Sequence, residues 1–75
     1  MSLRESLDEL LDRLRECYAS LDELNDALDA EVRELERRGV DFPTITKIES
    51  SYIFALKALG DAIMHIERLL THLKR

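Results

Sequence analysis

The stretch that decides the fold is Leu35-Glu36-Arg37-Arg38-Gly39-Val40-Asp41-Phe42-Pro43. Gly39 can take the left-handed conformation that ends many helices, and Val40 can then fold back on the last helical turn. Pro43 is tolerated in the first turn of a helix but not in a helix interior. The sequence therefore predicts one helix over residues 3–38, a turn over residues 39–43 and a second helix over residues 44–75.

The first predicted helix carries a heptad pattern. Ser2 and Glu5 have the spacing of a capping box, in which each residue can satisfy an amide of the other at a helix start. Apolar residues then fill the heptad a and d positions, and only Glu31 interrupts them. The a and d residues of this helix are Leu7, Leu10, Leu14, Cys17, Leu21, Leu24, Leu28 and Leu35.

The second predicted helix resumes the same pattern, with Thr44 or Thr46 as its candidate N-cap. Its a and d residues are Ile45, Ile48, Tyr52, Ala55, Leu59, Ala62, Ile66, Leu69 and Leu73. The short connection makes the two helices antiparallel neighbours. We therefore expect an all-α fold, a coiled-coil-like antiparallel two-helix hairpin that forms a single domain over residues 1–75.

A register centred between Asp41 and Phe42 brings a positions opposite d positions throughout. It pairs Leu21 with Ala62 and Leu24 with Leu59. It also places Glu31, the polar residue of the seam, opposite Tyr52, whose hydroxyl can donate a hydrogen bond to a carboxylate.

A third apolar stripe, at the heptad e positions, exceeds what an a/d seam needs. In an antiparallel hairpin the e stripes of both helices lie on the same flank, and contiguous apolar strips of this kind mark interfaces. We expect another protein chain to cover this flank and complete a helical bundle. It is either a second copy, giving a homodimeric four-helix bundle that serves as an assembly subunit, or a different protein. The predicted partner-binding residues are Leu11, Tyr18, Val32, Ile53, Leu56, Gly60, Ile63 and Leu70.

The charge is uneven along the chain. The net charge is −5; residues 1–38 hold 12 acidic and 6 basic side chains, whereas residues 39–75 hold 4 acidic and 5 basic ones. An acidic chain without a basic stripe is a poor candidate for binding nucleic acid or anionic lipid. The apolar runs are also far shorter than the roughly 20 residues of a membrane span, so we expect no membrane insertion.

The amino-terminal residues lack the pattern of a secretory or transit segment, and a lone cysteine suits a reducing compartment. We therefore expect a cytoplasmic protein.

The sequence offers no catalytic motif. His65 and His72 are seven residues apart, about 10 Å along a helix axis, which is too far for one metal ion. Cys17 at a d position is expected to be a small buried hydrophobe. No Gly-rich phosphate loop, nucleophile elbow or zinc spacing is present. We expect no enzyme, no cofactor and no metal site, and a function in binding another protein.

The stretch from Leu35 to Pro43, followed by Ala55-Leu56 and Ala62-Ile63, resembles the YscE-like co-chaperones of type III secretion needle subunits. The resemblance covers the hairpin layout and the Arg-Gly-Val turn. It implies a small co-chaperone in the bacterial cytosol that pairs with a TPR-like chaperone, the two holding a needle subunit before export. No functional residue is carried over from it.

Overall fold

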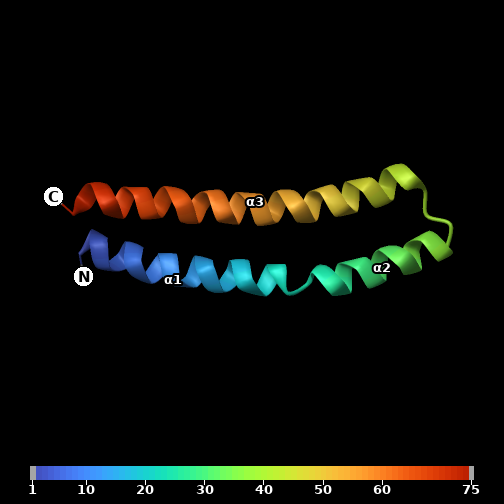
Figure 1. The fold of residues 1–75 in the computed structure, drawn as a ribbon, viewed down its shortest axis with the longest axis horizontal. Coiled ribbons are helices and arrows are strands. Elements are labelled where there is room, and N and C mark those ends of the chain that lie inside the picture. The colour runs from blue at the N-terminus through green and yellow to red at the C-terminus, as the bar shows by residue number, and fades with distance from the viewer. Residues whose placement is uncertain (1, 75) are drawn as a thin grey trace.

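The computed structural model describes residues 2–74 and shows three helices arranged as two antiparallel arms (Figure 1). One arm contains α1 (Leu3–Asp22) followed by α2 (Asn25–Arg37), and α3 (Phe42–Leu73) returns beside both. The molecule is 57 Å long and 18 by 14 Å across. The predicted all-α hairpin is confirmed, and no strand occurs in the described residues. Residues 1 and 75, the two ends of the predicted domain, lie outside them.

The predicted start of the first helix and the predicted turn are both found. The Ser2 hydroxyl accepts a hydrogen bond from the Glu5 amide at 3.2 Å and caps α1. At the other end of the arm, Gly39 has a φ of 83°, the left-handed region that glycine occupies without strain. The amide of Val40 donates to the Leu35 carbonyl, and that of Gly39 donates to the Glu36 carbonyl, both at 3.0 Å. These two bonds form the Schellman motif that reverses the chain.

The second arm starts earlier than the sequence pattern predicts. Asp41, not Thr44 or Thr46, is the N-cap of α3, so the helix begins at Phe42 rather than at residue 44. The Asp41 carboxylate accepts from the Thr44 amide at 3.3 Å and from the Thr44 hydroxyl at 2.7 Å. Aspartate is as good an N-cap as serine, and Pro43 then falls in the first turn, where its missing amide costs nothing.

The predicted helix over residues 3–38 is interrupted at Glu23 and Leu24, which separate α1 from α2. The break is slight, since both residues stay near helical dihedral angles, and the Leu24 amide donates to the Leu21 carbonyl in a tighter turn at 3.1 Å. Two causes coincide here. Asp22, Asn25 and Asp26 are weak helix formers, and the Tyr52 hydroxyl of α3 donates to the Leu21 carbonyl.

The predicted pairing of Glu31 with Tyr52 is therefore wrong. Tyr52 is half-buried and hydrogen-bonds to the backbone at the helix break, whereas Glu31 is exposed. A carbonyl at a helix end needs a donor, and a carboxylate that faces water does not.

The two arms pack through heptad positions a and e rather than a and d. Leu11, Val32, Ile45 and Leu70 are buried, at 4–6% exposure. By contrast Leu10, Leu24 and Leu69, which the a/d pattern places in the seam, are 42–54% exposed, and Cys17 is exposed. The predicted seam is thus wrong at most of its d positions, although Ile48 and Ala62 are half-buried. An a/e and an a/d alternation both repeat every 3.5 residues, so the arms can turn one stripe or the other inward. The half-buried members of the seam are Leu7, Leu14, Leu21, Leu28, Leu35, Ile48, Tyr52, Leu56, Leu59, Ile63 and Ile66.

Candidate protein-binding surface

Most of the residues predicted to bind a partner lie between the two arms instead. Leu11, Val32 and Leu70 are buried there by the chain itself, and Leu56, Gly60 and Ile63 are half-buried. In this hairpin these six residues are covered by the arms of the chain itself. The arms pack through their a and e positions, and this packing turns the e stripe inward.

Tyr18, a further member of the predicted set, lies against Gly60. A side chain added at Gly60 would place its Cβ 3.6 Å from Cε2 of Tyr18. That distance is an ordinary van der Waals contact, so a ring of the opposite arm, not another backbone, lies next to Gly60. Tyr18 remains 37% exposed and Ile53, the last member of the set, 60% exposed.

A different apolar stripe is exposed. Leu3, Leu10, Cys17 and Leu24 follow one another at seven-residue intervals on the first arm, so they share one helix face. The three leucines are 63%, 43% and 54% exposed, and Cys17 is also exposed. The equivalent positions of α3 are Ala55, Ala62 and Leu69. Leu69 and the adjacent Leu73 are 42% and 39% exposed. We call this surface the leucine flank: Leu3, Leu10, Cys17, Leu24, Ala55, Ala62, Leu69 and Leu73.

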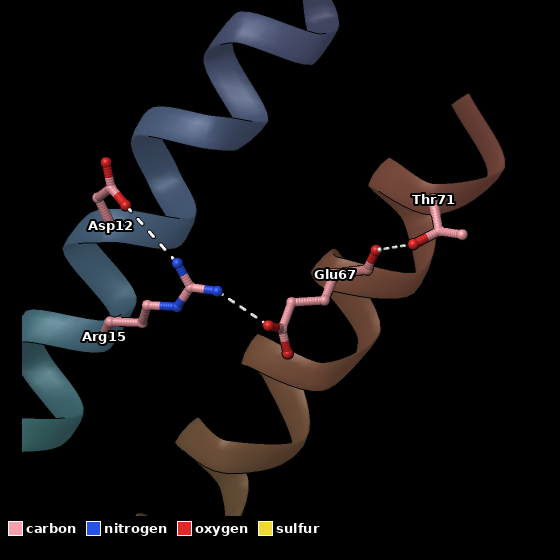
Figure 2. A network of polar contacts seen from close by, with 4 residues as sticks. All are labelled: Asp12, Arg15, Glu67 and Thr71. Atoms are coloured by element: carbon pink, nitrogen blue, oxygen red, sulfur yellow. Dashed lines mark hydrogen bonds and ion pairs between the residues drawn. The ribbon is translucent and has the colours of Figure 1, made fainter. Parts of the chain in front are cut away.

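Both halves of the leucine flank lie on one side of the hairpin. In an antiparallel pair, equivalent heptad positions of the two helices point to the same flank. The opposite flank shows this directly, because Arg15 of α1 and Glu67 of α3 occupy equivalent positions there and form an ion pair at 2.9 Å (Figure 2). Asp12 lies 3.9 Å from the same guanidinium. The two halves of the leucine flank therefore lie on one face that spans both arms.

The two flanks differ in chemistry. The flank with the Arg15–Glu67 pair also carries Asp8, Asp22, Asp29 and Lys74, and we call it the charged flank. Ile53 is a large apolar residue that is exposed on the charged flank. The leucine flank holds a shallow hollow on the first arm, lined by Arg13, Glu16, Cys17, Ser20, Leu21 and Leu24. An open apolar face with a few polar groups at its edge can bind another apolar face but offers no enclosed pocket for a small molecule.

Three further exposed apolar side chains lie apart from this face. Phe42 is 80% exposed at the start of α3, Phe54 is 66% exposed and Met64 is 37% exposed. Phe54 and Met64 lie on the outer side of α3, away from the other arm. Isolated exposed apolar residues are common on protein surfaces, so these three do not define a second site.

In residues 2–74, no three histidine, cysteine or acidic side chains are grouped so that they could hold a metal ion. None of the described helices is long and apolar enough to cross a membrane.

Comparisons with known proteins found no matching family model, no similar curated protein and no similar solved structure.

Proposed function

We propose that this chain is a non-catalytic protein-interaction module and that the leucine flank is the surface it presents to another chain. One observation carries the proposal: five leucines, each 39–63% exposed, fall on a single face of a two-helix protein whose other flank is charged. Binding is proposed rather than catalysis because the chemistry on this face is apolar.

Covering the face would change the stability of the hairpin substantially. Among residues 2–74, only four side chains are buried, so the core of the isolated hairpin is thin. Fully burying a leucine contributes about 1.5–3 kcal/mol, so covering five half-exposed leucines would contribute roughly 5 kcal/mol. That contribution is comparable to the whole stability of many small domains. A partner chain would therefore stabilise the fold as well as bind to it.

The occupant of the leucine flank has two possible forms. The first is a different protein, as the resemblance of the Arg-Gly-Val turn to the type III secretion co-chaperones implies. In that form the chain is a small co-chaperone in the cytoplasm. The second form is another copy of the chain in a homodimeric four-helix bundle.

Thermal unfolding of the purified chain, followed by circular dichroism over a hundredfold range of concentration, tests the proposal. Sedimentation equilibrium at the same concentrations gives the mass. An associated chain whose midpoint rises with concentration supports the proposal, with self-association as the mode. A monomer that unfolds over a broad range without cooperativity supports it with a different protein as the occupant. A monomer that unfolds cooperatively at one midpoint throughout the range overturns it.

A further inference from the structure

We infer that the chain covering the leucine flank is a second copy of this chain, with the two copies related by a two-fold axis parallel to the helices. The inference rests on the proposed function and names its partner. In this arrangement the first arm of each copy lies on α3 of the other.

The shape of the leucine flank favours a second copy. On the first arm the leucine flank is a ridge of large side chains, Leu3, Leu10 and Leu24. Along the middle of α3 the same flank is shallow, because its residues are Ala55 and Ala62, with Ala58 beside them. Ridges of one helix pack into the grooves of another. Where the ridge of one copy meets the groove of the other, as Leu24 does at Ala55, the face is complementary to a copy of itself that has been rotated about an axis between the arms.

The heights of these residues agree with that rotation. Tyr18 lies against Gly60, which sets Cys17, rather than Leu21 as the predicted register has it, near the height of Ala62. Leu24, seven residues further along, then falls near the height of Ala55, and Leu10 falls near Leu69. Rotation about an axis parallel to the helices leaves each residue at the same position along the helix axis. Each first-arm residue of one copy therefore meets the α3 residue that lies at the same height in the other copy. Leu24 would meet Ala55, Cys17 would meet Ala62, and Leu10 would meet Leu69.

The charges of the two arms favour an axis parallel to the helices. The first arm is strongly acidic, with a net charge of −6 over residues 1–38, whereas residues 39–75 carry +1. With the axis parallel to the helices, each acidic arm packs only on α3 arms, within its own copy and across the interface. With the axis perpendicular to the helices, the two acidic arms would pack against each other. Like charges across an interface oppose association, so the parallel axis is favoured.

The size of the face also suits a second copy. The face measures 57 by 18 Å, roughly 1,000 Å², and the leucine flank, which spans residues 3–24 of the first arm or about 32 Å, makes up a little over half of it. A standard interface covers about 800 Å² of each partner. One copy is therefore large enough to give the other a standard interface, without a further protein.

The test combines mass with one distance. Sedimentation equilibrium gives the number of copies. A spin label is then placed at the turn with Arg38→Cys in a Cys17→Ala background, and the distance between labels is measured by pulsed electron resonance. Arg38 is exposed, and Glu34 keeps its ion pair with Arg37 when Arg38 is replaced. The Cys17→Ala variant without the label site is the control for association. Phe42→Cys, 80% exposed at the same end, is the alternative label site if Arg38→Cys folds poorly.

The inferred dimer brings both turns to the same end. It therefore gives two copies and a label distance well below the 57 Å length of the molecule. A dimer whose labels are separated by nearly that length overturns the parallel axis. A monomer that becomes ordered only with another protein overturns the second copy as partner and leaves the proposed function standing. A monomer that unfolds cooperatively alone overturns both.

Discussion

The Tyr52 hydroxyl of α3 donates a hydrogen bond to the Leu21 carbonyl of α1, with 2.5 Å between the two oxygens. The Asp22 carbonyl lies 3.3 Å from the same hydroxyl. Both carbonyls belong to the last turn of α1, where backbone acceptors lack the partners that a continuing helix would provide. One side chain thus joins the long helix to the opposite arm where that arm is interrupted.

Replacing Tyr52 with phenylalanine should lower the melting temperature and leave the helical circular dichroism signal nearly unchanged. The phenylalanine ring can still pack in the seam, but the Leu21 and Asp22 carbonyls lose the hydroxyl donor, and the Leu21 carbonyl keeps the Leu24 amide as its donor. Tyr18→Phe is the matched control, because the Tyr18 ring, rather than its hydroxyl, makes the contact with Gly60. Equal melting temperatures for the two variants would show that the Tyr52 hydrogen bond does not stabilise the hairpin.

The same residue predicts a dependence on alkaline pH. Partial burial, followed by the nearby carboxylates of Asp22 and Asp29, raises the pKa of Tyr52 above its ordinary value of 10.0. A raised pKa means that the fold favours the neutral phenol. Its contribution to stability is therefore complete below pH 10 and is lost as the pH rises through the higher pKa of the folded state.

The midpoint of unfolding should accordingly fall more steeply above pH 10 in the wild-type chain than in Tyr52→Phe. Urea unfolding at a series of pH values from 8 upward, on the order of half a unit apart, measures this. Parallel curves for the two chains would contradict the assignment of the raised pKa to Tyr52.

The rotated seam predicts that two adjacent leucines respond very differently to alanine. Leu11 is 5% exposed and Leu10 is 43% exposed. Leu11→Ala should lower the free energy of unfolding by about 2–5 kcal/mol, the usual cost of a cavity in a core. Leu10→Ala should cost much less. Both are made in a Leu24→Lys background, because association through the leucine flank would otherwise protect Leu10. If urea unfolding shows that Leu10→Ala lowers the free energy of unfolding more than Leu11→Ala does, the arms pack through the a and d positions after all.

The ends of the hairpin could be predicted from the sequence because local chemistry decides them. Gly39 takes its left-handed conformation and Ser2 caps α1, as their positions indicate. The N-cap of α3 could also have been recognised, since Asp41 stands directly before a residue pair that ends in Pro43. The break at Glu23 and Leu24 was much harder to predict. It depends partly on Tyr52, about 30 residues away, whose hydroxyl reaches the Leu21 carbonyl.

The existence of an exposed apolar surface could be predicted from the sequence, but the residues that form it could not. Three apolar stripes run along each arm, and two suffice for the seam, so the sequence indicates a surplus stripe. It does not indicate which one, because leucines stand side by side at Leu10 and Leu11 and again at Leu69 and Leu70. Each candidate stripe also contains a polar residue that is unfavourable in a seam: Glu31 in the d stripe and Asn25 in the e stripe. Gly60 was the most informative signal, because the Tyr18 ring of the other arm lies next to it.

The most direct test of the docking face compares lysine at two exposed apolar positions on opposite flanks. Leu10 is on the leucine flank, and Ile53, which is 60% exposed, is on the charged flank. Each substitution changes the net charge from −5 to −4, so a general increase in repulsion cannot account for a loss of association. Lysine is also at least as good a helix former as the isoleucine it replaces and close to leucine.

Sedimentation equilibrium on the wild-type chain, Leu10→Lys and Ile53→Lys gives the answer, with circular dichroism confirming that helicity is retained. Leu10→Lys should weaken association at least tenfold, about 1.4 kcal/mol, because it places a charge in a desolvated contact. Ile53→Lys should keep the wild-type mass. If Leu10→Lys keeps the wild-type mass, or if both variants dissociate equally, the leucine flank is not the docking surface.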